Sequence, residues 1–246
     1  MKRQFIAVLD SGIGGISVLN ELEKNFPNEQ FLYYGDNDNA PYGNRSVQNL
    51  LSITIKNLDY ILRYNVKAIV LACNTLSVNL RKEIEEYSSI PTFCVYPPVE
   101  QCMQEKGLTL LLATNRTAQN YKSTARFHSV GLDGLAEKIE KNLYRINLFT
   151  DEEVFEECFE KGIINKKGYY DRIILGCTHY NFIKFQIYDH FQPRKITDGT
   201  QNLIFALKKF LKTNKSLVII KQNQTLFIGK NAKKNFYFYK KCGQRY

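Results

Sequence analysis

Short apolar runs separated by stretches with helical spacing dominate the pattern of the chain. The runs occupy residues 5–9, 31–34, 66–72, 91–95, 108–113 and 173–175. Continuous apolar runs of this kind are typical of strands that are buried on both faces, as in parallel sheets. Because strands that alternate with helices need crossover connections, the pattern predicts an α/β fold with mainly parallel sheets.

Helical spacing accounts for most of the segments between these runs. Val18, Leu22 and Phe26, for example, recur at four-residue intervals before Pro27. The same criterion predicts helices at residues 50–62, 76–87, 118–128, 134–142, 151–162, 182–191 and 203–211. Short strands are expected near the carboxyl end, at residues 217–220, 226–228 and 236–239.

The alternation restarts after Tyr96-Pro97-Pro98, and we expect the chain to cross back near Asp198-Gly199. We therefore predict two similar parallel-sheet α/β halves related by pseudo-twofold symmetry. The first domain would comprise residues 1–95 with 199–246, and the second residues 96–198. The active site is expected in the cleft between them, because open α/β sheets bind ligands at the carboxyl ends of their strands.

Two of the apolar runs end in the same way. One continues into Ala72-Cys73-Asn74-Thr75, and the other into Gly176-Cys177-Thr178-His179. Each cysteine therefore falls at the carboxyl end of a predicted strand, where a site is expected. If both ends face one cleft, two thiols lie across it.

The net charge of +10 comes from the carboxyl-terminal segment. Residues 208–246 hold eleven of the 34 Lys and Arg and no Asp or Glu, so residues 1–207 are nearly neutral. A basic segment that also carries Phe236, Tyr237, Phe238 and Tyr239 can indicate nucleic-acid binding. A solvated, Lys-rich terminus is the simpler interpretation, and we expect no nucleic-acid partner.

The six cysteines include no CxxC pair, and with three histidines the chain shows no metal-ligand spacing. We therefore expect no metal site. No apolar run approaches the length of a transmembrane helix, and the first ten residues become acidic too soon for a signal peptide. A cytoplasmic location with free thiols is expected.

Five motifs occur in one order along the chain: Asp10-Ser11-Gly12-Ile13-Gly14-Gly15, Gly35-Asp36, Pro41-Tyr42-Gly43, Ala72-Cys73-Asn74-Thr75 and Gly176-Cys177-Thr178-His179-Tyr180. Together they closely resemble glutamate racemase, of the cofactor-independent aspartate/glutamate racemase group, over residues 5–198. The resemblance implies an isomerase that interconverts L- and D-glutamate for peptidoglycan synthesis. It also implies a homodimer.

Racemisation removes the α-proton from one face of the substrate and returns a proton to the other, which calls for two acid/base groups. A thiolate and a thiol can exchange these roles when the direction reverses. A free thiol has a pKa near ~8.5, so its surroundings must activate one of the two. By resemblance, Cys73 would act on D-glutamate and Cys177 on L-glutamate.

The resemblance also implies roles for the polar neighbours. Asp10 and His179 would assist proton transfer or hold the ammonium group. The other substrate-binding residues would be Ser11, Tyr42, Gly43, Asn74, Thr75, Thr117 and Thr178. Several of these side chains could instead cap the helices that follow the strands.

One segment departs from the family pattern. The family usually carries Cys-Pro-x-Phe-Val-Pro-Leu-Val-Glu between the two cysteine motifs. We align this stretch with residues 143–150, which lack the cysteine, both prolines and the glutamate. Because that glutamate lies near the site in the family, aspartate is the alternative substrate.

Two rival functions come from other classes. A dinucleotide-binding protein is suggested by Gly12-Ile13-Gly14-Gly15-Ile16-Ser17, which approaches GxGxxG, and by Asp36 in the position of a ribose ligand. Ser17 replaces the third glycine, however, and this reading leaves both cysteine motifs unexplained. A catalytically inactive, nucleic-acid-binding relative is suggested by the basic tail, but both cysteines are intact.

Overall fold

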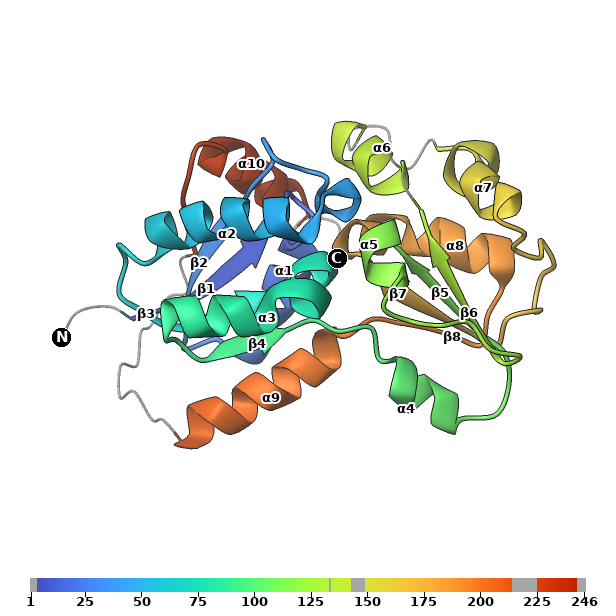
Figure 1. The fold of residues 1–246 in the computed structure, drawn as a ribbon, viewed down its shortest axis with the longest axis horizontal. Coiled ribbons are helices and arrows are strands. Elements are labelled where there is room, and N and C mark those ends of the chain that lie inside the picture. Colours follow the sequence, from blue (N-terminus) through green and yellow to red (C-terminus); the bar gives the residue numbers. More distant parts are fainter. Residues whose placement is uncertain (1–3, 133, 143–148, 214–224, 243–246) are drawn as a thin grey trace.

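The computed structural model describes residues 4–132, 134–142, 149–213 and 225–242, and it contains two separate sheets (Figure 1). The first sheet has the strand order β4-β3-β1-β2-β9, and every pairing is parallel. Its strands are β1 (Phe5–Asp10), β2 (Gln30–Gly35), β3 (Val66–Leu71), β4 (Thr92–Cys94) and β9 (Leu226–Phe227).

The second sheet has the order β6-β5-β7-β8 and is also parallel throughout. Its strands are β5 (Thr109–Ala113), β6 (Phe127–Gly131), β7 (Arg172–Gly176) and β8 (Lys195–Thr197). Counted within each half, the strands follow the same order of second, first, third and fourth, with β9 added at one edge of the first sheet. The predicted fold of two similar parallel halves is confirmed.

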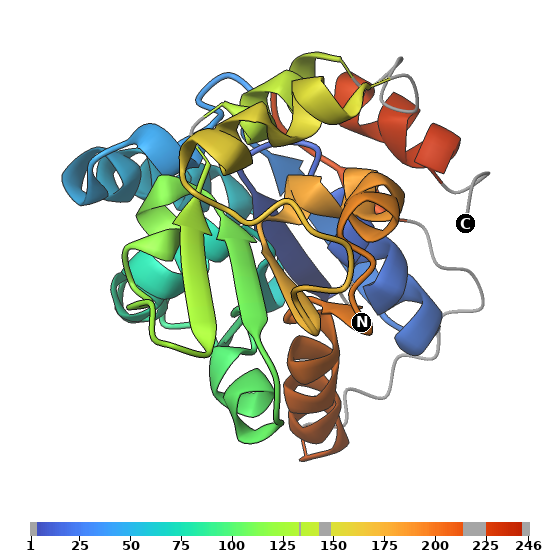
Figure 2. The same ribbon diagram turned by 90° about the vertical axis from the view of Figure 1, so that its right-hand side faces the viewer.

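Helices cover both faces of each sheet, as Figures 1 and 2 show. They are α1 (Ile16–Asn25), α2 (Val47–Ile61), α3 (Asn74–Ser88), α4 (Val99–Gln104), α5 (Asn115–Ala118), α6 (Leu135–Lys141), α7 (Asp151–Glu160), α8 (Lys184–Phe191), α9 (Thr200–Thr213) and α10 (Ala232–Cys242), with the 3₁₀ helices η1 (Tyr42–Asn44) and η3 (Thr178–Ile183). No helix among the described residues is both long enough and apolar enough to cross a membrane.

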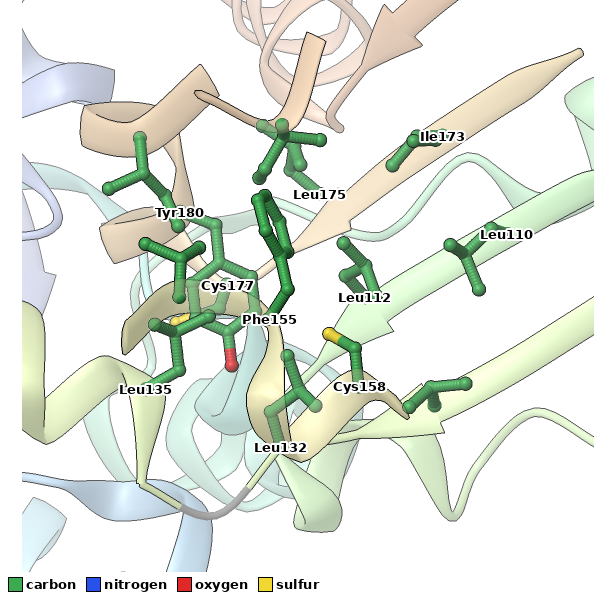
Figure 3. Packing of buried hydrophobic residues seen from close by; sticks show 14 of the residues in the cluster. Leu110, Leu112, Leu132, Leu135, Phe155, Cys158, Ile173, Leu175, Cys177 and Tyr180 are labelled. Carbon is green, nitrogen blue, oxygen red and sulfur yellow. The ribbon is translucent and has the colours of Figure 1, made fainter. Parts of the chain in front are cut away.

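Alternate residues of each central strand enter different cores, which explains the continuous apolar runs. Val8 belongs to the core that α1 and α9 cover, while Leu9 belongs to the core beneath α2 and α3. In the second half, Leu175 packs with Phe155 and Cys158 of α7 (Figure 3). Successive side chains of a strand point to opposite faces, so a strand covered on both faces must be apolar throughout.

The sequence-based assignment of elements was wrong in two places. The helix predicted at 118–128 is replaced by the short α5 and by β6, and the strand predicted at 236–239 is part of α10. β8 and α4 were not predicted. The predicted strand at 217–220 lies outside the described residues, as does most of the segment at 143–150.

Candidate active site

The two cysteines line one pocket between the halves. Cys73 follows β3 and Cys177 follows β7, at the carboxyl ends of corresponding strands. The pocket is lined by Ser11, Pro41, Tyr42, Gly43, Cys73, Asn74, Thr75, Thr114, Ala136, Cys177, Thr178 and His179. Its volume is about 10 Å³, close to the least that holds one water molecule. A ligand larger than water therefore fits only if the lining residues move apart.

A larger cavity, of about 400 Å³, lies away from the cysteines. Residues of α1, η3 and the start of α9 border it, including Ser17, Asn181 and Thr200. None of the predicted site residues lines this cavity. We place the chemistry at the small pocket because both thiols line it.

The surroundings of the two sulfur atoms differ. The Cys73 thiol donates to Ser11 Oγ at 3.9 Å, and burial together with the nearby Asp10 carboxylate raises the pKa of Cys73 to about 12. Cys177 Sγ lies 3.8 Å from His179 Nδ1. Cys73 therefore holds its proton, whereas Cys177 has a basic side chain as its direct neighbour.

His179 is paired with a carboxylate that the sequence analysis did not predict. His179 Nε2 lies 2.8 Å from Glu140 Oε2, and both side chains are largely buried. Burial alone would raise the pKa of Glu140, but hydrogen bonds from His179, Asn37 and the Ile13 amide lower it to about 2. Burial alone would lower the pKa of His179, but its contacts with Cys177 and Glu140 raise it well above its ordinary value.

Asp10 lies beneath the pocket rather than on its wall. Its Oδ1 accepts a hydrogen bond from the Gly12 amide at 3.0 Å, and its Oδ2 accepts one from Thr178 Oγ1 at 3.2 Å. Burial raises the pKa of Asp10, and the nearby His179 opposes that change. Asp10 therefore orients Thr178 and adds negative charge below the thiols.

Three threonine hydroxyls form a cluster at the pocket wall and just behind it. Thr75 Oγ1 lies 3.1 Å from Thr114 Oγ1 and 3.3 Å from Thr117 Oγ1. Thr114 caps α5, accepting from the Thr117 amide, and its hydroxyl also donates to Thr117 Oγ1 at 3.1 Å. Thr75 belongs to the first half and the other two to the second, so the cluster joins the halves.

Tyr42 lines the pocket, but its hydroxyl is already bonded within the protein. Its OH donates to Asp36 Oδ2 at 2.6 Å, and Asn57 Nδ2 donates to the same oxygen at 2.9 Å. Asn39 Nδ2 lies 3.0 Å from both carboxylate oxygens of Asp36. Since these protein groups already occupy the Asp36 carboxylate, the structure does not favour its proposed role as a ribose ligand.

Side chains from the second half lie against the glycine-rich turn that follows β1. A Cβ atom at Gly12 would lie 2.7 Å from Glu140 Oε2, and one at Gly14 would lie 2.7 Å from His179 Nδ1. Distances this short cannot be accommodated without displacing the carboxylate or the imidazole. The glycines are explained by this close approach, without a phosphate at the turn.

Comparisons with known proteins agree with this geometry. The chain is 34% identical to a glutamate racemase from Clostridium acetobutylicum over 227 residues, covering 86% of this chain and 85% of the relative. The chain belongs to the glutamate racemase family. No family model matches it.

Solved glutamate racemases share the fold. One isoform from Bacillus anthracis superposes with a TM-score of 0.76 at 23% identity, covering 100% of this chain and 94% of that one. The enzyme from Francisella tularensis in complex with D-glutamate gives a TM-score of 0.72 at 23% identity, covering 97% and 93%. At these identities the likeness concerns the arrangement of the two halves.

Within this member of the glutamate racemase family, most of the predicted site residues meet at the pocket. Asp10 and Thr117 lie just behind its wall, where they bond Thr178 and Thr114 respectively. The sequence analysis found the family's glutamate missing at residues 143–150, most of which lie outside the described residues. The structure places Glu140, from the preceding helix α6, beside His179.

Two further residues were missed. Thr114 lines the pocket beside Thr75, and Asn37 donates to Glu140 Oε1 at 2.6 Å. Thr114 follows a predicted strand directly, as polar residues also follow the strands that precede Cys73 and Cys177, and this signal could have identified it. Within the described residues, no three His, Cys, Asp or Glu side chains are arranged to hold a metal ion.

Proposed function

We propose that this chain racemises glutamate by moving protons between two thiols and the α-carbon, without an added cofactor. The observation that carries the proposal is the common pocket of Cys73 and Cys177, which follow corresponding strands in the two halves. The relatives in the same family are named glutamate racemases. The product, D-glutamate, is a precursor of peptidoglycan.

In the L-to-D direction, the Cys177 thiolate takes the α-proton, so that the Cα–H bond breaks and an S–H bond forms. The Cys73 thiol gives its proton to the opposite face of the α-carbon and becomes the thiolate. The raised pKa of Cys73 suits a donor that must hold its proton until this step. The reverse direction exchanges the roles, and proton exchange with solvent resets the pair for a further turnover in the same direction.

His179 supports this cycle from the side of Cys177. A protonated imidazole next to a sulfur favours the thiolate form. The contacts with Cys177 and Glu140 raise the pKa of His179 well above its ordinary value, which favours the protonated imidazole. Glu140 accepts a hydrogen bond from the other ring nitrogen and thereby directs Nδ1 toward Cys177.

The polar wall of the pocket suits a small dianionic amino acid. Ser11, Asn74, Thr75 and Thr114 line it, and each carries a hydroxyl or amide group. The first turns of α3 and η3 begin at the pocket, and the free backbone amides of helix N-termini favour carboxylates. Asp10, which lies beneath the thiols, is placed to attract the substrate ammonium.

The activity is tested by following the circular dichroism of L-glutamate and D-glutamate after addition of the purified protein. We expect the signal of either enantiomer to decay to zero, because the enantiomers have equal free energies. In D₂O, the product should carry deuterium at the α-carbon while the early substrate pool does not. Decay with aspartate but not with glutamate would establish the alternative substrate, and no decay with either would refute the proposal.

We also propose the domain division expected from the sequence, with residues 1–95 and 199–246 in one domain and 96–198 in the other. The composition of the two sheets supports this division, since β9 joins the first sheet after the chain leaves the second. A homodimer and a cytoplasmic location are proposed from the family resemblance. Analytical ultracentrifugation of the purified chain tests the dimer.

A further inference from the structure

The carboxyl-terminal helix α10 reaches the candidate active site. Lys234 Nζ lies 3.2 Å from Glu140 Oε1, so a lysine of the basic tail bonds the carboxylate that pairs with His179. Figures 1 and 2 both place α6, which carries Glu140, and α10 along the same upper edge of the molecule. The tail thereby gains a specific contact that its composition did not suggest.

The Glu140 carboxylate is held from several directions. Its Oε2 accepts from His179 Nε2 at 2.8 Å and from the Ile13 amide at 3.1 Å. Its Oε1 accepts from Asn37 Nδ2 at 2.6 Å and from Lys234 Nζ at 3.2 Å. Ile13, Asn37 and Lys234 belong to the first half or pack on it, whereas Glu140 and His179 belong to the second. Glu140 therefore joins the halves at the site.

Lys234 differs from the other two donors of the first half because it carries a charge. The side chain of Glu140 is 10% exposed, and burial of a carboxylate is costly unless positive charge compensates it. His179 supplies such a charge only while its imidazole is protonated. Lys234 places a second positive charge beside the carboxylate.

α10 is ordered by contacts that fix the position of Lys234. Asn235 is fully buried, and its Nδ2 donates to the Gly35 carbonyl at 3.4 Å. The ring of Phe238 lies 5.3 Å, centroid to centroid, from that of Phe182 in the second half, and the Tyr239 hydroxyl donates to Glu23 at 2.8 Å. Lys234 thus extends from a packed helix toward Glu140.

We propose that Lys234 is a positioning residue of the racemase site, which holds the Glu140 carboxylate against His179 and thereby fixes the geometry at Cys177. The proposal rests on the proposed racemase function. An ion pair with a half-exposed lysine contributes little to global stability. Loss of this ion pair should therefore change the rate of racemisation and the pKa of His179 more than the free energy of unfolding.

The kinetic test compares K234M, K234R and the control K233M, which changes the adjacent, exposed lysine of α10. We expect K234M to lower kcat/KM for glutamate about tenfold, a value typical of a lost charged hydrogen bond. The two directions must fall equally, because the equilibrium constant of racemisation is fixed. K234R should recover most of the activity, and K233M should match the wild type. Wild-type kinetics in K234M would overturn the proposal.

A double-mutant cycle tests whether Lys234 acts through Glu140. In an E140Q background, K234M should change kcat/KM less than about twofold, because the carboxylate that Lys234 positions is already gone. If K234M lowers kcat/KM by the same factor in E140Q as in the wild type, Lys234 does not act through Glu140 and the proposal fails. Should K234M not fold, K234Q takes its place in the cycle.

The third measurement needs no activity, so it separates this proposal from the racemase function. The imidazole NMR signals of His128, His179 and His190 can be assigned by single substitutions and followed with pH. The titratable groups that face His179 are Cys177, Glu140 and Asp10, and Lys234 lies beyond Glu140. If K234M frees Glu140 to turn away, the pKa of His179 falls. An unchanged pKa, or a rise from the loss of a nearby positive charge alone, would contradict a positioning role.

Discussion

Asp10 Oδ2 accepts a hydrogen bond from Thr178 Oγ1 at 3.2 Å, which joins the end of β1 in the first half to the residue after Cys177 in the second. Asp10 is fully buried and Thr178 nearly so. The bond therefore fixes the position of one thiol-bearing turn relative to the other half. It also places a carboxylate where burial raises its pKa.

This placement predicts opposite effects of D10N on activity and stability. The folded pKa of Asp10 lies above the unfolded value of ~3.9. Its contribution to stability is therefore fully present below that unfolded value and is lost as pH rises through the folded pKa. The neutral D10N variant avoids this loss, so at pH 7.5 its free energy of unfolding should equal or exceed that of the wild type.

The activity of D10N should fall about 100-fold, as expected when a group that assists proton transfer is removed. Urea denaturation at pH 7.5 and pH 4, together with the racemisation assay, measures both effects. D189N, on the exposed face of α8, is the control and should change neither. A D10N variant that is markedly less stable at pH 7.5 would show that the ionised carboxylate stabilises the fold.

The two-thiol mechanism predicts that C73S and C177S each lose racemisation by at least about 1,000-fold, because a serine hydroxyl is far too weak an acid to form the base. Each variant should keep one-sided chemistry on a substrate with a good β-leaving group, since elimination needs only proton abstraction. C73S should retain elimination from the L-substrate, and C177S from the D-substrate. The opposite pattern would reverse the assignment of the thiols.

The control for the thiol variants is C94S, because Cys94 is a partly buried cysteine that does not line the pocket. It should racemise glutamate at the wild-type rate. Full activity in either C73S or C177S would end the two-thiol mechanism. Cys158 is less suitable as a control, since it is fully buried in the core beneath α7 and its replacement disturbs packing (Figure 3).

The glycine-rich turn gives a third prediction. In G14A, the added Cβ would overlap Thr178 Oγ1 and lie 2.7 Å from His179 Nδ1. Relief of the overlap should displace the second half at the site, at a cost of about 1–3 kcal/mol in stability. We expect kcat to fall more than tenfold with the α/β circular dichroism spectrum unchanged.

The matched control is G134A, at which the added Cβ meets only Glu157 Oε2 at 4.0 Å. Its kcat should stay within about twofold of the wild type, since ordinary van der Waals contact displaces nothing. If G14A is as active as G134A, the turn has room that the structure does not show, and the close approach does not explain the glycine.

The elements that sequence predicted best are those whose side chains are buried on both faces. β1, β3 and β7 carry long apolar runs because each lies inside its sheet with helices on both sides. β6 and β8 are edge strands of mixed burial, so they carry no such run. The aromatic run at 236–239 favours a strand by propensity, but tertiary contacts of Phe238 and Tyr239 with the rest of the chain accompany a helix.

The site residues differed in the same way in how well the sequence predicted them. Residues that adjoin strand ends, such as Cys73, Asn74 and Thr178, were predictable because the fold brings the strand ends together. Glu140 and Lys234 come from helices at the periphery of the halves, and only tertiary packing brings them to His179. A charged residue on a polar helix looks the same in sequence whether it faces solvent or a buried imidazole.

The threonine cluster gives the last prediction, which concerns substrate binding. Thr114 lines the pocket, whereas Thr117 is fully buried behind it and bonds the Thr114 hydroxyl. A hydroxyl that donates to a substrate carboxylate makes a charge-assisted bond worth about 1.5–3 kcal/mol. T114V should therefore raise the KM for glutamate about tenfold or more, and T117V by a smaller factor because it only loosens Thr114.

T54V is the control, because it also replaces a threonine hydroxyl by a methyl group but does so away from the pocket. Thr54 is fully buried in α2, and its hydroxyl has no hydrogen-bond partner among the described residues. Its replacement should leave KM unchanged and should stabilise the fold slightly or not at all, since no bond is lost. The measurements are KM in both directions by circular dichroism and the free energy of unfolding in urea. If T117V raises KM as much as T114V, then Thr117 itself contacts the substrate when the halves open, as the family resemblance first implied.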